Sequence, residues 1–291
     1  VPAGKLVRCW LPYPRTDQAR QRDVKFISAS EPDYVLSPQE CRHSTLYMEK
    51  RAVQGEPTVF SETFEYTSCG EWHNLRAEDV LPYDTTTALY KEYTAEREKH
   101  IVFSPRLREL AAKLTAGETN PYLKAKRIFR WINDHFPWAS AREYSTIENI
   151  PEYVLDNRHG DCGQVSLLFI TLCRISGIPA HFQSGFMMHP RAWNLHDWAE
   201  VYFEGVGWVP VDQSFGIPAF ARNADEEYFF LGGIDSWRMI VNTDYGMPLV
   251  PEKKYPRSET VDFQRGEVEW EGGNLYFPQW SYHMDIDYLN Y

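Results

Sequence analysis

A nearly continuous apolar segment lies in the middle of the chain, and the neighbouring elements are arranged around it. Apolar residues over 165–175 recur at helical spacing and cover almost the whole helix surface, which is the pattern of a buried helix. Asp161 precedes the segment as a candidate N-cap, and Gly177 follows it as a candidate C′ residue. The sequence therefore predicts a buried helix here. It is followed by three strand-like runs, at residues 179–186, 195–203 and 208–212.

Two further helices are clearly delimited upstream of this segment. Ser104 and Asn120 are each followed by proline, so each can cap a helix whose first position is that proline. Apolar residues at helical spacing continue to Gly117 in the first segment and to Pro137 in the second, and Pro151 can open a short third helix. Helices that precede a buried helix and a set of strands favour an α+β fold.

The two ends of the chain have the pattern of β structure. Residues 7–14 contain prolines and predict an extended edge strand, and residues 44–53 and 58–67 are two further strand-like runs. These runs predict a small β-sandwich-like domain at the start of the chain. At the other end, residues 267–270 and 282–288 are candidate strands around a Gly-Gly-Asn turn.

Length and composition limit the class of protein. The 291 residues, of which 43% are hydrophobic, are sufficient for one large domain or two. No apolar run approaches the length of a membrane span. The net charge of −11 argues against nucleic acid as a partner, because such a partner requires a basic stripe. The acidity favours solubility first, and basic or neutral substrates second.

Candidate chemistry lies at the start of the buried helix and on the strands after it. Cys162 falls in the first turn, where unpaired N–H groups and the helix dipole favour a thiolate, although the charge of Asp161 opposes this. His196 lies on the second strand-like run, and Asp212 ends the third. A cysteine nucleophile needs an imidazole to take its proton and a carboxylate to orient the imidazole. These three residues are candidates for those roles.

The spacing of His196 and Asp212 allows the two side chains to meet. Residue 204 is midway between them in sequence and lies in a predicted turn over residues 204–207. A tight antiparallel hairpin would therefore bring them opposite or diagonal to each other on one face, about 5–8 Å apart. A register slip of one residue would move Asp212 to the other face. The pairing thus depends on the hairpin register.

Four short motifs, taken together in this order, resemble the core of the transglutaminase-like superfamily. The resemblance covers roughly residues 104–216. The motifs are Gly160-Asp161-Cys162-Gly163, Gly177-Ile178-Pro179-Ala180 followed by Gly185, His196-Asp197-Trp198-Ala199-Glu200, and Gly207-Trp208-Val209-Pro210-Val211-Asp212. The resemblance implies a papain-like cysteine site with Cys162 as nucleophile, His196 as base and Asp212 as orienter. It does not imply crosslinking, since the superfamily also includes peptidases, amidases and proteins without known activity.

The patterns and the resemblance together predict an α+β fold in three parts. Residues 1–100 form the N-terminal β domain and a connecting region, which resembles the N-terminal region of some bacterial transglutaminase-like proteins. Residues 101–242 form the papain-like catalytic core, with the nucleophile helix packed on an antiparallel sheet. Residues 243–291 form a β-rich C-terminal extension that packs on the core.

Four residues near the predicted triad are weaker candidates for the site. The resemblance implies an aromatic or polar oxyanion donor upstream of the cysteine, in addition to the Cys162 backbone N–H. The indole N–H of Trp138 is a candidate for this donor, and burial of Trp138 in the core is the alternative. Met187, Met188 and Trp193 lie on the loop that leads into the second strand, where they can line a cleft for apolar groups.

No metal or cofactor is expected. The chain has no C-x-x-C, no H-E-x-x-H, no phosphate-binding G-x-G-x-x-G and no loop with calcium-ligand spacing. Of the five cysteines, Cys9, Cys41 and Cys69 could supply one disulfide, whereas Cys162 and Cys173 are too far apart on one helix to pair. An odd number leaves at least one free thiol.

The location and the activity follow from the resemblance. Because the chain begins with Val1 and its bacterial relatives are often exported, we expect a periplasmic or extracellular protein, with a cytoplasmic location as the alternative. The favoured function is hydrolysis of a peptide or protein amide bond through a Cys162 thioester. A transamidase and a non-catalytic peptide- or glycan-binding protein on the same fold are the alternatives. A papain-type peptidase is disfavoured, because His196 follows Cys162 too closely. The oligomeric state stays open.

Overall fold

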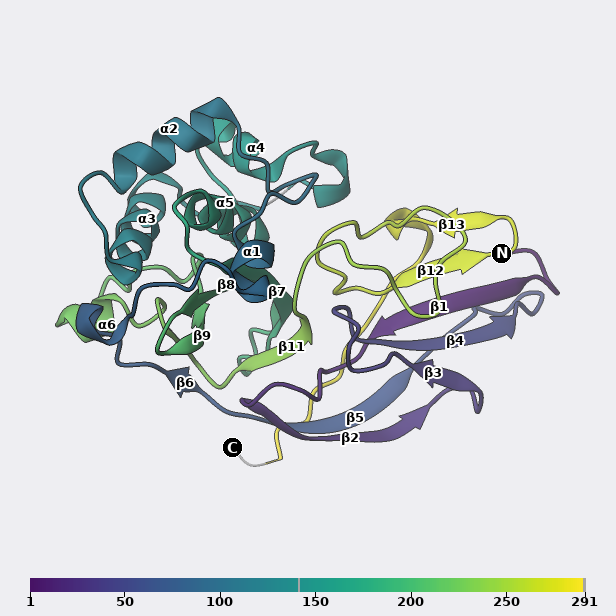
Figure 1. Ribbon diagram of the computed structural model, residues 1–291. Coiled ribbons are helices and arrows are strands. Elements are labelled where there is room, and N and C mark those ends of the chain that lie inside the picture. The colour runs from purple at the N-terminus through teal and green to yellow at the C-terminus, as the bar shows by residue number, and fades with distance from the viewer. Residues whose placement is uncertain (141, 290–291) are drawn as a thin grey trace.

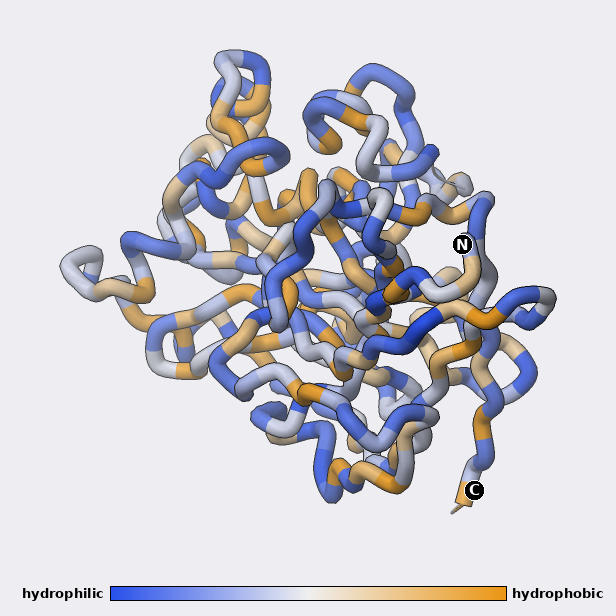
Figure 2. Tube along the Cα trace, turned by 90° about the vertical axis from the view of Figure 1, so that its right-hand side faces the viewer, coloured by the Kyte–Doolittle hydropathy of each residue, from blue (hydrophilic) through white to orange (hydrophobic). Residues whose placement is uncertain are grey.

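The computed structural model describes residues 1–140 and 142–289 and has two lobes (Figure 1). One lobe contains most of the helices and a four-stranded sheet, and the other consists mainly of strands. Hydrophobic segments are concentrated toward the middle of the molecule, whereas many outer loops are hydrophilic (Figure 2). The predicted α+β class is confirmed.

Three capped helices form the outer part of the helical lobe. Their N-caps, Ser104, Asn120 and Asn149, each accept a hydrogen bond from a backbone N–H of the first turn. Each helix carries proline in its first two positions, where the missing N–H would have no partner within the helix. The predicted helices are therefore present. They are α2 (Pro105–Leu114), α3 (Pro121–His135) and α4 (Ile150–Asn157).

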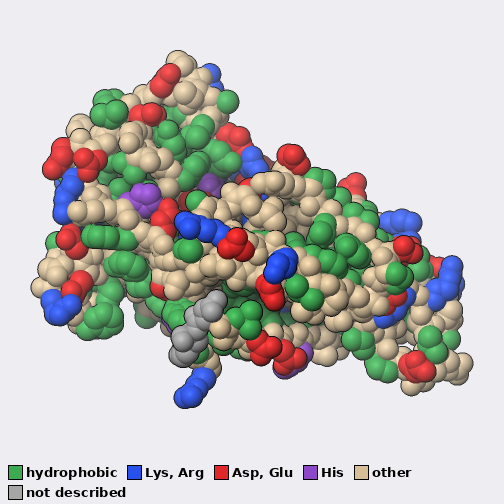
Figure 3. All heavy atoms as spheres, turned by 90° about the horizontal axis from the view of Figure 1, so that it is seen from below, with side chains coloured by type: hydrophobic (Ala, Val, Ile, Leu, Met, Phe, Trp, Pro, Cys, Tyr) green, Lys and Arg blue, Asp and Glu red, His purple; other side chains and the backbone are tan. Residues whose placement is uncertain are grey.

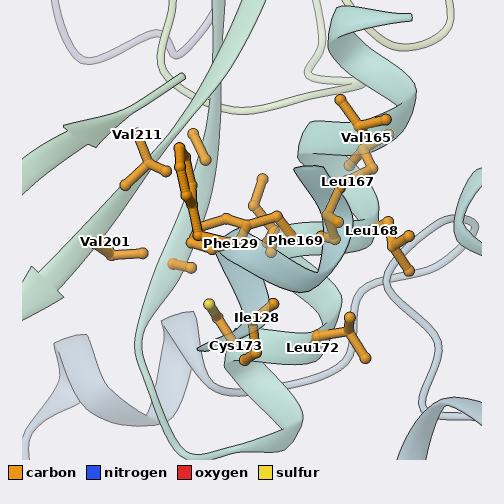
Figure 4. Packing of buried hydrophobic residues seen from close by; sticks show 14 of the residues in the cluster. Ile128, Phe129, Val165, Leu167, Leu168, Phe169, Leu172, Cys173, Val201 and Val211 are labelled. Atoms are coloured by element: carbon orange, nitrogen blue, oxygen red, sulfur yellow. The ribbon is translucent and has the colours of Figure 1, made fainter. Parts of the chain in front are cut away.

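The predicted buried helix is α5 (Cys162–Ile175), on which the rest of the lobe packs. Asp161 caps it by accepting a hydrogen bond from Gln164 N, and the Gln164 side chain accepts one from Asp161 N. Every residue over 163–174 is buried, because α2, α3, α4 and the sheet surround the helix. Figure 4 shows side chains of this core, among them Phe129, Phe169, Val201 and Val211.

The sheet beside α5 is antiparallel, with the strand order β11-β7-β8-β9. The register of β8 and β9 aligns Ala199 with Val211 and Phe203 with Gly207. This register differs by two residues from an arrangement with His196 opposite Asp212, so the two residues are diagonal neighbours. An even shift preserves the face on which a side chain lies. The strands are β7 (Ala180–Met187), β8 (Asn194–Phe203), β9 (Gly207–Val211) and β11 (Arg238–Asn242).

The other lobe is built from both ends of the chain. A five-stranded sheet has the order β13-β12-β1-β4-β3, and β2 and β5 form a separate pair. In Figure 1 the C-terminal strands, in yellow, lie beside the N-terminal β1, in purple. The strands are β1 (Leu6–Pro12), β2 (Gln21–Ala29), β3 (Tyr34–Leu36), β4 (Thr45–Arg51), β5 (Glu62–Ser68), β12 (Glu267–Trp270) and β13 (Gly273–Leu275).

Two predictions about these strands are wrong. β1 is not an edge strand, since it lies between β12 and β4. Its central position is tolerated because Pro12 is the last residue of the strand and Pro14 lies beyond it. The second error concerns residues 282–288, which form no strand in the described chain. The partner of β12 is instead β13, which follows a tight turn and pairs Trp270 with Gly273.

Short elements connect the two lobes. β6 and β10 form a two-residue ladder between the predicted connecting region and the segment that joins β9 to β11. Beyond β11, Tyr245 and Val261 belong to the core of the helical lobe, whereas Leu249 packs with Trp10 of the other lobe. The remaining elements are β6 (Glu71–Trp72), η1 (Ala77–Asp79), α1 (Ala88–Tyr93), η2 (Tyr144–Thr146), α6 (Ala224–Glu227), β10 (Gly233–Ile234) and η3 (Phe277–Gln279).

Candidate active site

The hairpin of β8 and β9 brings His196 and Asp212 into direct contact. His196 Nε2 lies 2.7 Å from Asp212 Oδ2, and both side chains are buried. An ionised carboxylate can only accept, so Nε2 carries the proton of the neutral imidazole and Nδ1 is the basic nitrogen. The structure therefore brings together the two residues that the spacing predicted as base and orienter.

Asp212 is surrounded by hydrogen-bond donors. Its Oδ2 also accepts a hydrogen bond from Arg238 Nη2 at 3.0 Å, and its Oδ1 accepts from Ser214 Oγ and Phe215 N, each at 3.2 Å. Burial opposes ionisation of Asp212, but the charges of His196 and Arg238 together with these hydrogen bonds lower its pKa. The carboxylate is thus held ionised against the imidazole.

Phe215 and Arg238 also fix the imidazole from the side. The Phe215 ring meets the His196 ring edge to face, with centroids 5.4 Å apart, and the Arg238 guanidinium lies 4.5 Å from the centroid of Phe215. Arg238 is fully buried and forms a second ion pair, at 2.9 Å, with Asp235. Sequence reasoning missed Arg238, which lies on β11, outside the segment that contains the motifs.

Cys162 is the first residue of α5, as predicted, and is partly accessible to solvent. Its Sγ lies 3.5 Å from Asp197 Oδ2. Within the described chain, the thiol forms no hydrogen bond with His196. Desolvation by the surrounding protein, followed by the charges of Asp197 and Asp161, raises the pKa of the Cys162 thiol. The start of the helix alone does not make a thiolate here.

One cavity of about 460 Å³ joins these residues. Cys162, His196 and Asp197 line it from the core. Trp138, Ser140 and residues 142–145 line it before α4, and six residues between Ser258 and Arg265 line it from the C-terminal part of the chain. Sequence analysis assigned no role to this last segment, because it carries no motif. The cavity therefore combines the predicted nucleophile and base with a wall that lies outside the motif region.

Carboxyl groups without a cationic partner surround the sulfur. In residues 1–140 and 142–289, Asp161, Asp197 and Asp262 form no ion pair, although all three line the cavity. Burial raises the pKa of Asp161 and of Asp262 to about 6 each. Burial and the charges of Asp262 and Asp161 raise the pKa of Asp197 well above its usual value. These three carboxyl groups therefore bind their protons more tightly than ordinary carboxyl groups do.

Tyr144 and Gln264 organise the carboxyl groups. The Tyr144 hydroxyl lies 2.6 Å from Asp161 Oδ1 and 3.3 Å from Asp197 Oδ2, and it accepts a hydrogen bond from Gly163 N at 3.2 Å. Gln264 Nε2 donates to Asp197 Oδ1 at 2.8 Å. Strand alternation could have revealed Asp197, because it shares a face of β8 with the core residues Ala199 and Val201. A carboxyl at such a position needs special partners.

An ion pair joins the two loop walls of the cavity. Arg265 donates to both carboxylate oxygens of Glu143, at 3.0 Å and 2.9 Å, and its Nε donates to Glu259 at 2.6 Å. This contact links the segment before α4 to the C-terminal segment. Glu143 and Glu259 share the single positive charge of Arg265, whereas Asp161, Asp197 and Asp262 form no ion pair in the described chain.

The weaker site candidates have different positions. Trp138 lines the cavity and is 59% exposed, so the alternative of a core residue is wrong, while its role as an oxyanion donor stays a prediction. Met187 also lines the cavity. Met188 and Trp193 are not among its described lining residues, because both pack into a core cluster that contains Trp10. Their part in substrate binding stays a prediction.

The five cysteines are all free thiols, so the disulfide considered among Cys9, Cys41 and Cys69 is absent. Cys173 is buried in the core, as predicted. Among the described residues, no cluster of three His, Cys, Asp or Glu side chains could hold a metal ion. No helix of the described chain is long and apolar enough to cross a membrane. Figure 3 shows acidic and basic side chains interspersed on one face of the molecule.

Comparison with known proteins shows which family the core of this fold resembles. Residues 108–213 match the transglutaminase-like superfamily. The structure is similar over 92% of the chain to 93% of a candidate cysteine protease from Cytophaga hutchinsonii, with a TM-score of 0.53 and 17% sequence identity. At this identity the likeness concerns the fold. The chain therefore carries a core of the transglutaminase-like superfamily.

Two curated proteins share part of this core. The uncharacterized protein YebA of Bacillus subtilis is 26% identical over 140 residues, which are 41% of this chain and 19% of YebA. A protein-glutamine gamma-glutamyltransferase of Pseudomonas aeruginosa is 23% identical over 125 residues, which are 39% of this chain and 19% of that protein. The matched part thus spans about a fifth of the length of each relative.

Proposed function

We propose that the protein is a cysteine-dependent acyl-transfer enzyme that hydrolyses an amide bond of a peptide or protein. One observation carries the proposal: the ionised Asp212 holds the His196 imidazole at 2.7 Å, and that imidazole shares a cavity of about 460 Å³ with Cys162. The superfamily membership of residues 108–213 supports the same class of chemistry. The name of the Cytophaga hutchinsonii structure is in agreement with it.

The proposed reaction starts with proton transfer from Cys162 Sγ. Because Asp212 occupies Nε2 of His196, the proton goes to Nδ1 and gives a thiolate and an imidazolium. In the structure the thiol contacts Asp197, so the thiol must come into contact with His196 before this transfer. Catalytic hydrogen bonds often become short only once substrate is bound.

The thiolate then attacks the carbonyl carbon of the substrate. The bond to the leaving amine breaks, His196 returns its proton to that amine, and a thioester remains on Cys162. Water then attacks the thioester and releases the acid and the free thiol. The helix-start N–H of Cys162 and the Trp138 indole are proposed donors to the oxyanion.

A transamidase remains the second candidate, because one relative is named a protein-glutamine gamma-glutamyltransferase. The two reactions share the thioester and differ in what attacks it. We favour water, since it is always available and no amine site is defined in the cavity. We also propose that the protein acts outside the cytoplasm, as its bacterial relatives often do.

The test is to trap the thioester and to identify what releases it. The protein is incubated with a library of peptide amides and then quenched in acid, and Cys162 adducts are sought by mass spectrometry. Cys162→Ser serves as the control, since it cannot form a thioester. The proposal predicts an acyl adduct on Cys162 and release of the free acid. Release as an amide when a primary amine is added would show the transamidase, and no adduct with any peptide would favour the binding protein.

A further inference from the structure

We propose that Asp197 is a further catalytic residue of this site and acts as a neutral carboxylic acid whose O–H stabilises the Cys162 thiolate. The inference rests on the proposed function and deepens it. Asp197 touches the reacting atom, because its Oδ2 lies 3.5 Å from Cys162 Sγ. It is also only 1% exposed, so its protonation state depends on the protein groups around it.

Counting protons around Tyr144 shows why one carboxyl must be neutral. The Tyr144 oxygen has two carboxyl contacts, at 2.6 Å to Asp161 Oδ1 and at 3.3 Å to Asp197 Oδ2. Each oxygen–oxygen hydrogen bond needs one proton, and tyrosine supplies one. The second proton must come from a carboxyl group. The Gly163 N–H also donates to the tyrosine oxygen, but it does not supply a proton between that oxygen and a carboxyl group.

The partners of each carboxyl group decide which one holds the extra proton. Asp161 caps α5, and a cap is best filled by an ionised acceptor at the positive end of the helix. Its Oδ1 accepts from Gln164 N and lies at the shorter of the two tyrosine contacts. Asp197 is more deeply buried and, in the described chain, its carboxyl group accepts no backbone N–H of the first turn of α5. The tyrosine proton therefore points to Asp161, and the extra proton belongs to Asp197.

The hydrogen bonds of Asp197 are those of a neutral acid. Gln264 Nε2 donates to Oδ1 at 2.8 Å, which defines Oδ1 as the carbonyl oxygen. Oδ2 is then the hydroxyl oxygen, and it faces Tyr144 and Cys162. The ionisable groups around Asp197 are the acids Asp161 and Asp262, Tyr144 and the thiol itself. Without a cation among them, a second negative charge beside the thiolate would be repelled.

The neutral acid has a defined role in the first step. When the thiol proton moves to Nδ1 of His196, the Asp197 O–H turns from Tyr144 to the sulfur and donates a hydrogen bond to the thiolate. The Asp197 proton is not transferred, so proton and charge balance are those of the cysteine–histidine pair alone. An ionised Asp197 would place two negative charges 3.5 Å apart and would suppress the thiolate.

Substitution of Asp197 separates the two protonation states. Asp197→Asn keeps an acceptor for Gln264 and a donor for the sulfur, and it is neutral at every pH. We expect it to change the rate of Cys162 alkylation by iodoacetamide at pH 7 by less than about threefold, because one neutral donor replaces another. Asp197→Ala loses the donor to a charged group, and we expect the rate to fall about 10- to 100-fold. Labelled sites are mapped by mass spectrometry, since other cysteines are free.

Two results would overturn the inference. If Asp197 is ionised, Asp197→Asn removes a negative charge beside the sulfur and speeds alkylation by more than about tenfold. If Asp197 has no role, Asp197→Ala leaves the rate unchanged. An ordinary alkylation rate in the unaltered protein, with no effect of His196→Ala, would instead count against the proposed function.

Infrared spectroscopy tests the protonation state without any reaction. The unaltered protein should show a carboxylic acid C=O band at pH 7.5 that is missing in Asp197→Asn. Asp262→Asn is the matched control, because the pKa of Asp262 is raised only to about 6 and its carboxyl group is ionised at this pH. Absence of any band that depends on Asp197 would refute the neutral acid even if the thiol proved unreactive.

Discussion

Two aspartates, one on the imidazole side of the site and one on the sulfur side, are buried to almost the same degree, but their pKa values are shifted in opposite directions. Asp212 is 0% exposed and Asp197 is 1% exposed. Four donors, one of them the Arg238 guanidinium, surround Asp212, and its pKa is lowered despite burial. Asp197 has acidic neighbours and no cation, and burial raises its pKa. The comparison teaches that partners, more than burial, set the charge of a buried carboxyl group.

This difference fits the two tasks that a cysteine site requires. On the imidazole side, a fixed negative charge orients His196 and stabilises the imidazolium that forms. On the sulfur side, a fixed negative charge would oppose the thiolate, so a carboxyl there is useful only when it is neutral. The following predictions change first the imidazole side, then the sulfur side, and last the ion pair between the loop walls.

The largest effect is expected from removing the charge on the imidazole side. Asp212→Asn keeps the shape of the side chain but favours the wrong imidazole tautomer, so acylation by 4-nitrophenyl acetate should slow by roughly a thousandfold or more. Stopped-flow release of nitrophenol measures this rate. Ser214→Ala removes only one donor to Asp212, at 3.2 Å, and should retain most of the rate. Equal rates for Asp212→Asn and the unaltered protein would show that Asp212 has no role in the reaction.

The next largest effect is expected from removing the buried cation of Arg238, and this effect is on stability. Arg238→Met leaves the buried carboxylate of Asp212 and the partly exposed carboxylate of Asp235 without their shared partner. The free energy of unfolding should fall by about 3–5 kcal/mol, as when one member of a buried ion pair is removed. Urea denaturation at pH 7 measures it. Arg238→Lys keeps the charge and should lose less, whereas a loss below about 1 kcal/mol in Arg238→Met would contradict the charge balance.

The sulfur side should show the opposite dependence on charge. A raised pKa means that folded protein binds the proton of Asp262 more tightly than unfolded protein does. The resulting stability is complete below about pH 4 and is lost as the pH rises through about 6. Asp262→Asn should therefore be about 1–3 kcal/mol more stable than the unaltered protein at pH 7.5.

Thermal or urea unfolding at two pH values checks this sign. The difference between Asp262→Asn and the unaltered protein should shrink at pH 4.5, where both side chains are largely neutral. The pKa of Asp17 is shifted in the direction opposite to that of Asp262. Hydrogen bonds and the charge of Arg15 lower it even though burial opposes this. The account of the sulfur side would be contradicted if the stability difference between Asp262→Asn and the unaltered protein were less favourable to Asp262→Asn at pH 7.5 than at pH 4.5.

The smallest effect is expected where the two loop walls meet. The Glu143–Arg265 pair is partly exposed, with 48% of the Glu143 side chain accessible. Glu143→Gln should lower the free energy of unfolding by less than about 1 kcal/mol. The loss should shrink in 1 M NaCl, because salt screens exposed charges. A loss that persists in high salt would show that the pair is a structural link between the walls.

The parts of the site that the sequence predicted are local. Asp161 and Cys162 lie at the start of a helix whose caps and apolar spacing were readable. His196 and Asp212 meet because one tight hairpin joins them, and only the parity of its register had to be right. Sequence reasoning works here because each contact depends on a few neighbouring residues.

The parts that the sequence did not predict are distant contacts. Gln264 reaches Asp197 across 67 residues, and Arg238 reaches Asp212 from another strand. β12 pairs with β1 from the opposite end of the chain. The spacing of apolar and polar residues does not predict such contacts, since they depend on how whole elements pack. The packing of Met188 against a core that contains Trp10 was not predicted for the same reason, since the two residues are far apart in sequence.

The most direct test of the central claim is the pH dependence of Cys162 alkylation in the unaltered protein and in His196→Ala. Iodoacetamide reacts with the thiolate, so the rate against pH reports when the sulfur loses its proton. If His196 is the base, Cys162 reacts rapidly well below pH 8, and His196→Ala slows that reaction by at least about tenfold. If Cys162 reacts like an ordinary thiol in both proteins, no thiolate–imidazolium pair forms and the acyl-transfer mechanism is contradicted.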